Sequence, residues 1–123
     1  MKVKRTERGW AGHFILSYRC RFRRNTLLEC GDIKIIVSTV GNYVNPDNLI
    51  EKLGFNRYYE TMAFHSDPND TRYNDANVSR QVYFASPWEI GSTDADNEAN
   101  EMHEMVVKEI SRNLAKGVLY ETE

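Results

Sequence analysis

Two apolar runs separated by Gly31-Asp32 constrain the fold of this 123-residue chain more than any other feature. Residues 26–30 read Thr-Leu-Leu-Glu-Cys, and residues 33–40 read Ile-Lys-Ile-Ile-Val-Ser-Thr-Val. Gly31 supplies the positive φ that a two-residue hairpin turn requires. The second run is β-branched and apolar at consecutive positions, which is typical of a strand covered on both faces. The sequence therefore predicts a β-hairpin whose return strand lies inside a sheet.

The segment before this hairpin alternates between arginine and apolar residues. A period of two places Cys20 and Phe22 on one face of a strand. The opposite face then carries three guanidinium groups, those of Arg19, Arg21 and Arg23. The pair Arg24-Asn25 interrupts the alternation, which predicts a bulge or a tight turn with Arg24 close to the other arginines.

Shorter signals complete the expected order of elements. Residues 9–16, 58–65 and 80–86 are rich in aromatic and β-branched residues, which predicts three more strands. Residues 45–48 form a predicted turn, residues 49–53 a short helix, and residues 66–77 an exposed loop. We expect residues 1–8 to be a flexible basic tail and residues 9–120 to be a single domain.

The C-terminal part of the chain has the pattern of an amphipathic helix. Apolar residues recur there at spacings of three and four, at Ala99, Met102, Val106, Ile110 and Leu114. Candidate caps are Thr93, Asp94 and Asp96, and Gly117 marks the expected end. Because one face of this helix must be buried, we expect an α+β fold: an antiparallel sheet of about five strands with one C-terminal helix packed on it.

Two cysteines and the lack of long apolar runs bear on the compartment. No segment approaches the roughly 18 apolar residues of a membrane span, and no apolar stretch follows the basic start, so no signal peptide is expected. Cys20 and Cys30 lie near the ends of one extended segment, about 30 Å apart at about 3.3 Å per residue. Disulfide-bonded Cα atoms lie roughly 4.4–6.8 Å apart. We therefore predict two reduced thiols in a cytoplasmic protein.

The net charge of −2 hides an uneven distribution along the chain. Residues 1–24 contain eight Lys and Arg against one Glu, whereas the other 99 residues contain eight basic and seventeen acidic residues. Such asymmetry is typical of a basic patch that meets an acidic partner. A basic strand that packs beside the acidic parts of its own fold explains the same pattern, and both interpretations stay open.

The candidate binding surface consists of the arginine cluster and nearby aromatic residues. Its members are Arg19, Arg21, Arg23, Arg24, Trp10 and Tyr59. Arginine makes bidentate contacts with carboxylates and phosphates, and sheet-borne aromatic rings beside arginines can stack on bases. The alternative is that these arginines pair with acids of the same chain and that the aromatic rings belong to the core.

Motifs of catalytic, nucleotide and metal sites are absent from the sequence, so no cofactor and no metal site is expected. The string that starts at His103-Glu104 resembles a zinc-protease helix, but Val107 stands where the second histidine would be. A helical histidine beside a carboxylate is an ordinary surface pair. His13, Glu60 and an arginine remain as the parts of a possible acid–base site for phosphodiester cleavage.

Four strings resemble a family of small proteins encoded by phages and prophages. They cover residues 8–14 (RGWAGHF), 21–26 (RFRRNT), 37–41 (VSTVG) and 57–64 (RYYETMAF). The resemblance spans about residues 8–110 and carries no enzymatic activity. It implies an accessory protein of a mobile element, a class that includes inhibitors of host defence systems.

The function expected from these observations is non-enzymatic binding of a host or phage macromolecule in the host cytoplasm. This function includes inhibition of a host defence system, as anti-CRISPR proteins do. The most favoured partner is a protein, and no membrane contact is expected. The alternative is a small nucleic-acid-binding module, or a metal-independent phosphodiester-acting enzyme, that uses the arginines. The sequence does not decide the oligomeric state, and a homodimer is one of the alternatives.

Overall fold

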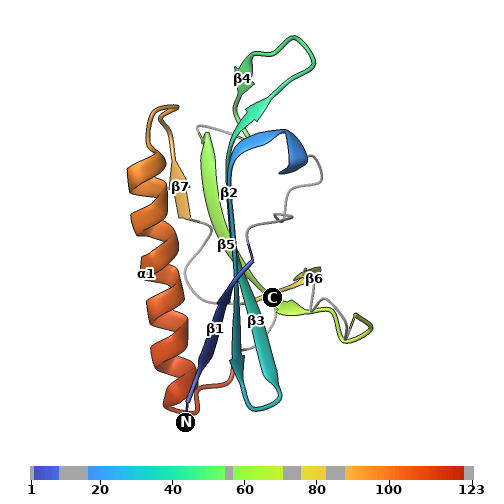
Figure 1. Ribbon diagram of the computed structural model, residues 1–123, viewed down its shortest axis with the longest axis vertical. Coiled ribbons are helices and arrows are strands. Elements are labelled where there is room, and N and C mark those ends of the chain that lie inside the picture. Colours follow the sequence, from blue (N-terminus) through green and yellow to red (C-terminus); the bar gives the residue numbers. More distant parts are fainter. Residues whose placement is uncertain (1, 9–16, 55–56, 71–75, 83–87, 121–123) are drawn as a thin grey trace.

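A sheet and one helix form two layers in the computed structural model, which describes residues 2–8, 17–54, 57–70, 76–82 and 88–120 (Figure 1). Within these residues the strands run in the order β1-β2-β3-β5-β6, while β4 pairs with β3 and β7 with β5, and every pairing is antiparallel. The strands are β1 Lys4–Glu7, β2 Cys20–Cys30, β3 Ile33–Val44, β4 Ile50–Glu51, β5 Tyr59–Ser66, β6 Ala76–Gln81 and β7 Trp88–Ile90. A 3-10 turn, η1, covers Ser17–Arg19, and helix α1 covers Asp96–Ala115. The expected α+β class with its C-terminal helix is confirmed.

The β2–β3 hairpin is the longest pairing of the sheet and confirms the strongest sequence prediction. Cys30 pairs with Ile33 across the turn, where Gly31 has φ 61°. The pairing keeps one register as far as Cys20 and Tyr43, so the bulge predicted at Arg24-Asn25 is wrong. The strand continues there because the Arg24 side chain meets carboxylates on the helix-covered face.

Both faces of β3 are buried, as its apolar sequence predicts. Every side chain from Ile35 to Val40 has no exposed surface. Ile35 and Val37 lie in the cluster beneath α1, whereas Ile36 and Val40 face the other side of the sheet. The sheet therefore has an interior on each side of its central strand.

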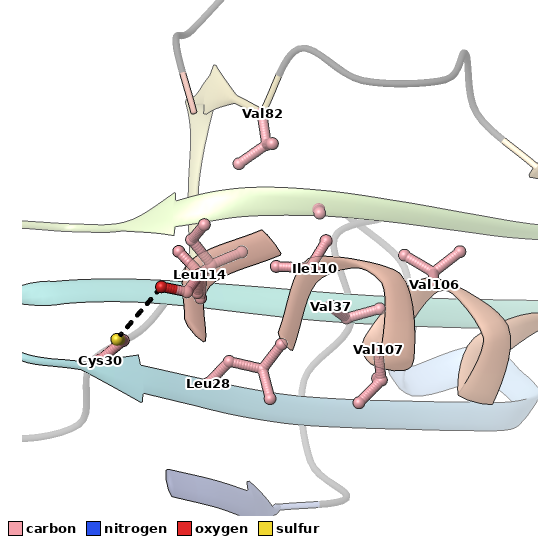
Figure 2. Packing of buried hydrophobic residues seen from close by; sticks show 10 residues of the cluster. Leu28, Cys30, Val37, Val82, Val106, Val107, Ile110 and Leu114 are labelled. Atoms are coloured by element: carbon pink, nitrogen blue, oxygen red, sulfur yellow. Dashed lines mark hydrogen bonds between the residues drawn. The ribbon is translucent and has the colours of Figure 1, made fainter. Parts of the chain in front are cut away.

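Helix α1 packs on the sheet through the predicted apolar stripe (Figure 2). All five residues of the stripe are buried: Ala99, Met102, Val106, Ile110 and Leu114. Ile110 and Val106 meet Leu28 and Val37 of the sheet in one cluster. None of the predicted caps acts at the start, since Ala95 is the N-cap residue. The chain turns away at the other end where Gly117 has φ 86°.

Three short strands differ from the sequence predictions. Lys4–Glu7, predicted as part of a tail, form β1 and pair with β2 from Lys4↔Glu29 to Glu7↔Thr26. Residues 49–53, predicted as a helix, contain β4, because the Asn45 side chain accepts the N–H groups of Asp47 and Leu49 and turns the chain back toward β3. Strand β7 is not predicted at all.

Other predicted segments overlap only in part with what the structure describes. The predicted strand 9–16 lies outside the described residues. Strand β6 covers Ala76–Gln81, so it begins earlier than the predicted strand 80–86, of which residues 83–87 are not described. The predicted loop after β5 is correspondingly shorter than 66–77.

Both cysteines are free and buried, in agreement with the prediction from their spacing. Cys30 lies under the end of α1, where its Sγ is 3.6 Å from the Leu114 carbonyl oxygen (Figure 2). Burial raises the pKa of Cys20 to about 11, so its thiol stays protonated at neutral pH. In the described part of the chain, no helix has the length and apolarity needed to cross a membrane.

Candidate functional site

Arg21 and Arg23 are both exposed near the start of β2. Their neighbours Phe22 and Arg24 point toward the helix, where Phe22 packs with Ala99 and Met102. Alternation along the strand therefore sends Arg23 to the opposite face. Cys20 packs with Val40 on that same face, so the prediction that Cys20 and Phe22 share a face is wrong, and the alternation breaks between them, at the exposed Arg21. No hydrogen bond or ion pair joins either guanidinium to a described residue. Two neighbouring cations, about 6.6 Å apart along the strand, are thus presented to solvent.

Arg19 is not part of this exposed pair. It belongs to η1, and its Nε donates to the Val44 carbonyl at 2.7 Å while Nη2 donates to the Asn45 carbonyl at 3.0 Å. The strand alternation predicted from the sequence fails here because β2 begins only at Cys20. Arg19 instead fixes the segment that carries Tyr18 to the turn between β3 and β4. In Figure 1 this turn projects beyond the body of the sheet.

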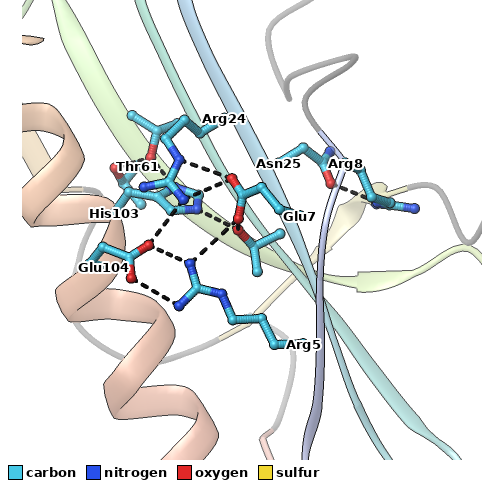
Figure 3. Close-up of polar contacts among 10 residues, drawn as sticks. Arg5, Glu7, Arg8, Arg24, Asn25, Thr61, His103 and Glu104 are labelled. Carbon is cyan, nitrogen blue, oxygen red and sulfur yellow. Dashed lines mark hydrogen bonds and ion pairs between the residues drawn. The ribbon is translucent and has the colours of Figure 1, made fainter.

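Arg24 also leaves the predicted surface, because it points toward α1. Its guanidinium lies 2.8 Å from Glu7 Oε1 and 3.0 Å from Glu104 Oε2. Arg5 reaches the same Glu104 carboxylate with Nη1 at 2.9 Å. Two arginines and two glutamates from β1, β2 and α1 thus form one network (Figure 3). Of the two explanations for the arginine cluster, internal pairing applies to Arg24.

Tyr59 is buried and supports the start of α1 rather than a surface. Its hydroxyl donates to Asp96 Oδ1 at 2.6 Å and accepts from Asn42 Nδ2 at 2.8 Å. The ring packs edge-on against Phe22, with ring centroids 5.6 Å apart. Gly41 leaves room for this ring, since a Cβ at that position would overlap it. Trp10, the other aromatic candidate, lies outside the described residues.

The structure describes one of the two residues of the acid–base hypothesis, Glu60. Glu60 lies on β5, is buried, and forms an ion pair with Arg57 at 2.6 Å. His13 lies outside the described residues. Glu60 therefore has an arginine beside it, and the hypothesis stays untested at its histidine.

A buried histidine that the sequence interpretation assigned to the surface lies at the centre of the polar contacts. His103 on α1 has no exposed surface. Its Nε2 is 2.7 Å from Thr26 Oγ1 on β2, and its Nδ1 is 2.7 Å from Thr39 Oγ1 on β3. Thr39 in turn lies 2.6 Å from Thr61 on β5. One imidazole thus links the helix to three strands.

The direction of each hydrogen bond follows from the carboxylate at the end of this chain. Thr26 donates its only hydroxyl proton to Glu7 Oε2 at 2.6 Å, so its oxygen must accept from His103 Nε2. The neutral ring then has an unprotonated Nδ1, which accepts from Thr39, and Thr39 accepts from Thr61. With His103 neutral and protonated at Nε2, every one of these hydrogen bonds has a donor and an acceptor.

The charges around His103 agree with this assignment. Burial lowers the pKa of His103 to about 4, and the nearby Arg24 guanidinium lowers it as well. The hydrogen bond from Arg5 holds the pKa of Glu104 at about 2. Burial opposes ionisation of Glu7, but the hydrogen bonds from Thr26 and Arg24 still hold its pKa below the usual value. His103 is therefore neutral at pH 7, although the charged side chains of Arg24, Glu7 and Glu104 lie near it.

This network connects elements and offers no site for a reactant. Both ring nitrogens of His103 are engaged by threonine hydroxyls, and the side chain is closed to solvent. Residues 2–8, 17–54, 57–70, 76–82 and 88–120 contain no group of three His, Cys, Asp or Glu side chains able to hold a metal ion. The exposed pair Arg21 and Arg23 remains the part of the predicted site that is available to a partner.

Comparisons with known proteins give no family for this chain: no family model, curated protein or solved structure matches it.

Proposed function

We propose that this chain is a non-enzymatic accessory protein of a phage or prophage that binds a host or phage protein through the exposed Arg21 and Arg23 of β2. The observation that carries the proposal is the pair of exposed guanidiniums without an intramolecular partner among the described residues. The resemblance of four sequence strings to phage-encoded proteins supports the setting. Inhibition of a host defence system is the role we infer from that setting.

Exposed apolar and aromatic side chains at η1 and at the turn between β3 and β4 support a protein interface. Tyr18 is 66% exposed and Leu49 is 63% exposed. Arg19 holds their two segments together through its bonds to the Val44 and Asn45 carbonyls. Tyrosine and arginine dominate the binding energy of many protein interfaces, and a rigid segment loses less entropy on binding. The partner we infer is a protein with an acidic surface.

Nucleic acid is the second candidate, and the charge distribution favours it less. Affinity for nucleic acid depends on how many phosphates the protein neutralises. Only Arg21 and Arg23 of the four clustered arginines have no partner among the described residues. Arg19 binds carbonyl oxygens, and Arg24 binds glutamates. The chain as a whole has a net charge of −2. An enzyme based on Glu60 has less support, because among the described residues only Glu60 and Arg57 of its proposed site are placed.

Capture of the partner by immobilised protein tests the proposal. The wild type and the double variant Arg21→Glu/Arg23→Glu are exposed to lysate of infected host cells, with and without nuclease treatment. A matched control, Lys108→Glu/Arg112→Glu, makes the same change of charge on exposed positions of α1. We expect a discrete protein to be retained from nuclease-treated lysate by the wild type and the control, at least tenfold above the β2 variant.

Two results would contradict the proposal. Retention of the same protein by the Arg21→Glu/Arg23→Glu variant would show that these two arginines do not form the binding surface. Retention that disappears with nuclease, together with a steep dependence on salt, would favour the nucleic-acid-binding alternative.

A further inference from the structure

A cavity of about 380 Å³ opens where the β2–β3 turn, the end of β5 and β6 meet. It lies beyond Cys30, whereas Arg21 and Arg23 lie at the other end of β2. Three neighbouring strands each contribute a basic side chain to its lining: Lys34, His65 and Arg80. The size is that of a pocket for a small molecule, which is commonly about 300–1,000 Å³.

An irregular stretch of β6 brings Arg80 to this cavity. Phe64 pairs with Gln81 and Ser66 with Ala76, so one residue of β5 faces four residues of β6. Arg80 lies in that bulged stretch and is half-buried. No hydrogen bond or ion pair joins its guanidinium to a described residue. A guanidinium partly withdrawn from water favours a ligand that supplies the missing acceptors.

The imidazole of His65 is a second basic group in the lining, and a nearby negative charge would raise its pKa. Its Nε2 donates to the Tyr120 carbonyl at 3.1 Å, because a carbonyl oxygen only accepts. The neutral ring therefore leaves Nδ1 without a proton. Burial lowers the pKa of His65; the Tyr120 bond opposes this, and Arg80 lowers the pKa further. An anion beside the imidazole would reverse that effect of Arg80.

Two carboxylates also line the cavity, Asp32 and Asp67. Asp67 Oδ1 accepts the backbone N–H of Asn69 at 2.9 Å. The charge of Arg80 acts on the pKa of His65, so the guanidinium lies near the imidazole. The cavity therefore has basic groups, with Arg80 near His65, and carboxylates in the same lining.

We propose that this cavity binds a small phosphate monoester, with the phosphoryl group at Arg80, His65 and Lys34 and the organic part beside Asp32 and Asp67. Arginine recognises phosphate oxygens by paired hydrogen bonds, and lysine adds a point charge. Carboxylates accept hydrogen bonds from hydroxyl groups, so they suit an organic part that carries hydroxyls, as a sugar does. This site is separate from the surface proposed on β2 and does not depend on it.

Titration of the His65 ring by NMR tests the site, with ribose 5-phosphate as the probe. Saturating probe should raise the pKa of His65 by about one unit, because a nearby opposite charge favours the protonated ring. Uncharged ribose at the same concentration should leave it unchanged. The Arg80→Gln variant should lose the response to the probe and, without the probe, should show a higher His65 pKa than the wild type. Arg112→Gln, an exposed arginine on α1, is the matched control and should behave as the wild type.

Three outcomes would overturn the inference. The His65 resonances do not move with ribose 5-phosphate at 10 mM or so, or they move equally in Arg80→Gln. In either case no phosphoryl site exists at this cavity. Equal affinity for inorganic phosphate and for the ester would overturn the assignment of the organic part. Each result leaves partner capture by Arg21 and Arg23 unaffected, so the two proposals fail separately.

Discussion

At the residue scale, His103 joins α1 to three strands through hydroxyl groups whose protons all have a defined direction. The helical spacing contains a signal for its burial, since His103 lies four residues after Ala99 and seven before Ile110, on the apolar stripe. The adjacent Glu104 favours a surface interpretation instead. Which interpretation holds depends on Thr26 and Thr39, and their nearness to the helix follows only from the packed structure.

The neutral state of His103 predicts a specific dependence of stability on pH. The pKa of His103 is about 4 in the folded protein and about 6.5 when unfolded, so between these values the unfolded chain binds the additional proton. The free energy of unfolding should therefore fall by about 3 kcal/mol as the pH falls from 7 to 4 on account of this residue. The stability due to Glu104 is lost in a lower window, from about pH 4.5 down to about pH 2.

His103→Gln isolates this contribution, because its amide offers a donor and an acceptor but does not titrate. At pH 7 the variant should be less stable than the wild type by about 1–3 kcal/mol, the cost of imperfectly satisfied buried hydroxyls. Urea denaturation at several pH values should show this gap shrinking toward pH 4. Parallel stability profiles of the two proteins would contradict a neutral buried His103.

The two thiols give a second prediction at this scale. Cys20 is 4% exposed and Cys30 is 1% exposed, and the pKa of Cys20 is about 11. Because alkylation requires an accessible thiolate, native protein at pH 8 should react slowly with iodoacetamide, and protein in urea should be labelled at both sites. Mass spectrometry without reductant measures this directly. A Cys20–Cys30 crosslink in freshly purified protein would contradict the two free thiols.

At the element scale, long elements with a strong period are predictable from the sequence and short ones are not. The β2–β3 hairpin and α1 have turn residues and apolar periods that indicate them without reference to the rest of the chain. Strand β1 carries the charges of a tail, and its stability depends on distant residues, since Glu7 binds Arg24 and Arg5 binds Glu104. Such partners cannot be read from the local pattern.

Helix α1 contributes to the core mainly through its apolar stripe. Ile110 has no exposed surface and packs in the cluster with Leu28 and Val37. Ile110→Ala should lower the free energy of unfolding by about 2–5 kcal/mol, the usual cost of removing a large buried aliphatic group. The comparison is Met105→Ala, at a 48% exposed position on the same helix, which should change stability little. Equal effects of the two substitutions would mean that α1 does not pack as described.

At the scale of the whole molecule, the basic N-terminal part of the chain divides between internal and external roles. Arg5 and Arg24 bind glutamates beneath α1, and Arg19 binds backbone carbonyls. Arg21 and Arg23 are left exposed to solvent. The sequence allows both an internal and a recognition role for the arginine cluster, because alternation alone says which residues share a face and not which acids lie near them. In the folded chain Arg19 and Arg24 have internal roles, whereas Arg21 and Arg23 remain available to a partner.

The measurement that tests the central claim most directly compares folding and binding in one variant, Arg21→Glu/Arg23→Glu. Both side chains are exposed and unpaired among the described residues, so thermal melting should stay within a few degrees of the wild type, since exposed charges contribute about 0–1 kcal/mol each. Affinity for the captured partner, measured by calorimetry on the same preparation, should fall at least tenfold. A folded variant that binds as tightly as the wild type would contradict a recognition role for these two residues, and a grossly destabilised variant would mean that these arginines are paired inside the fold.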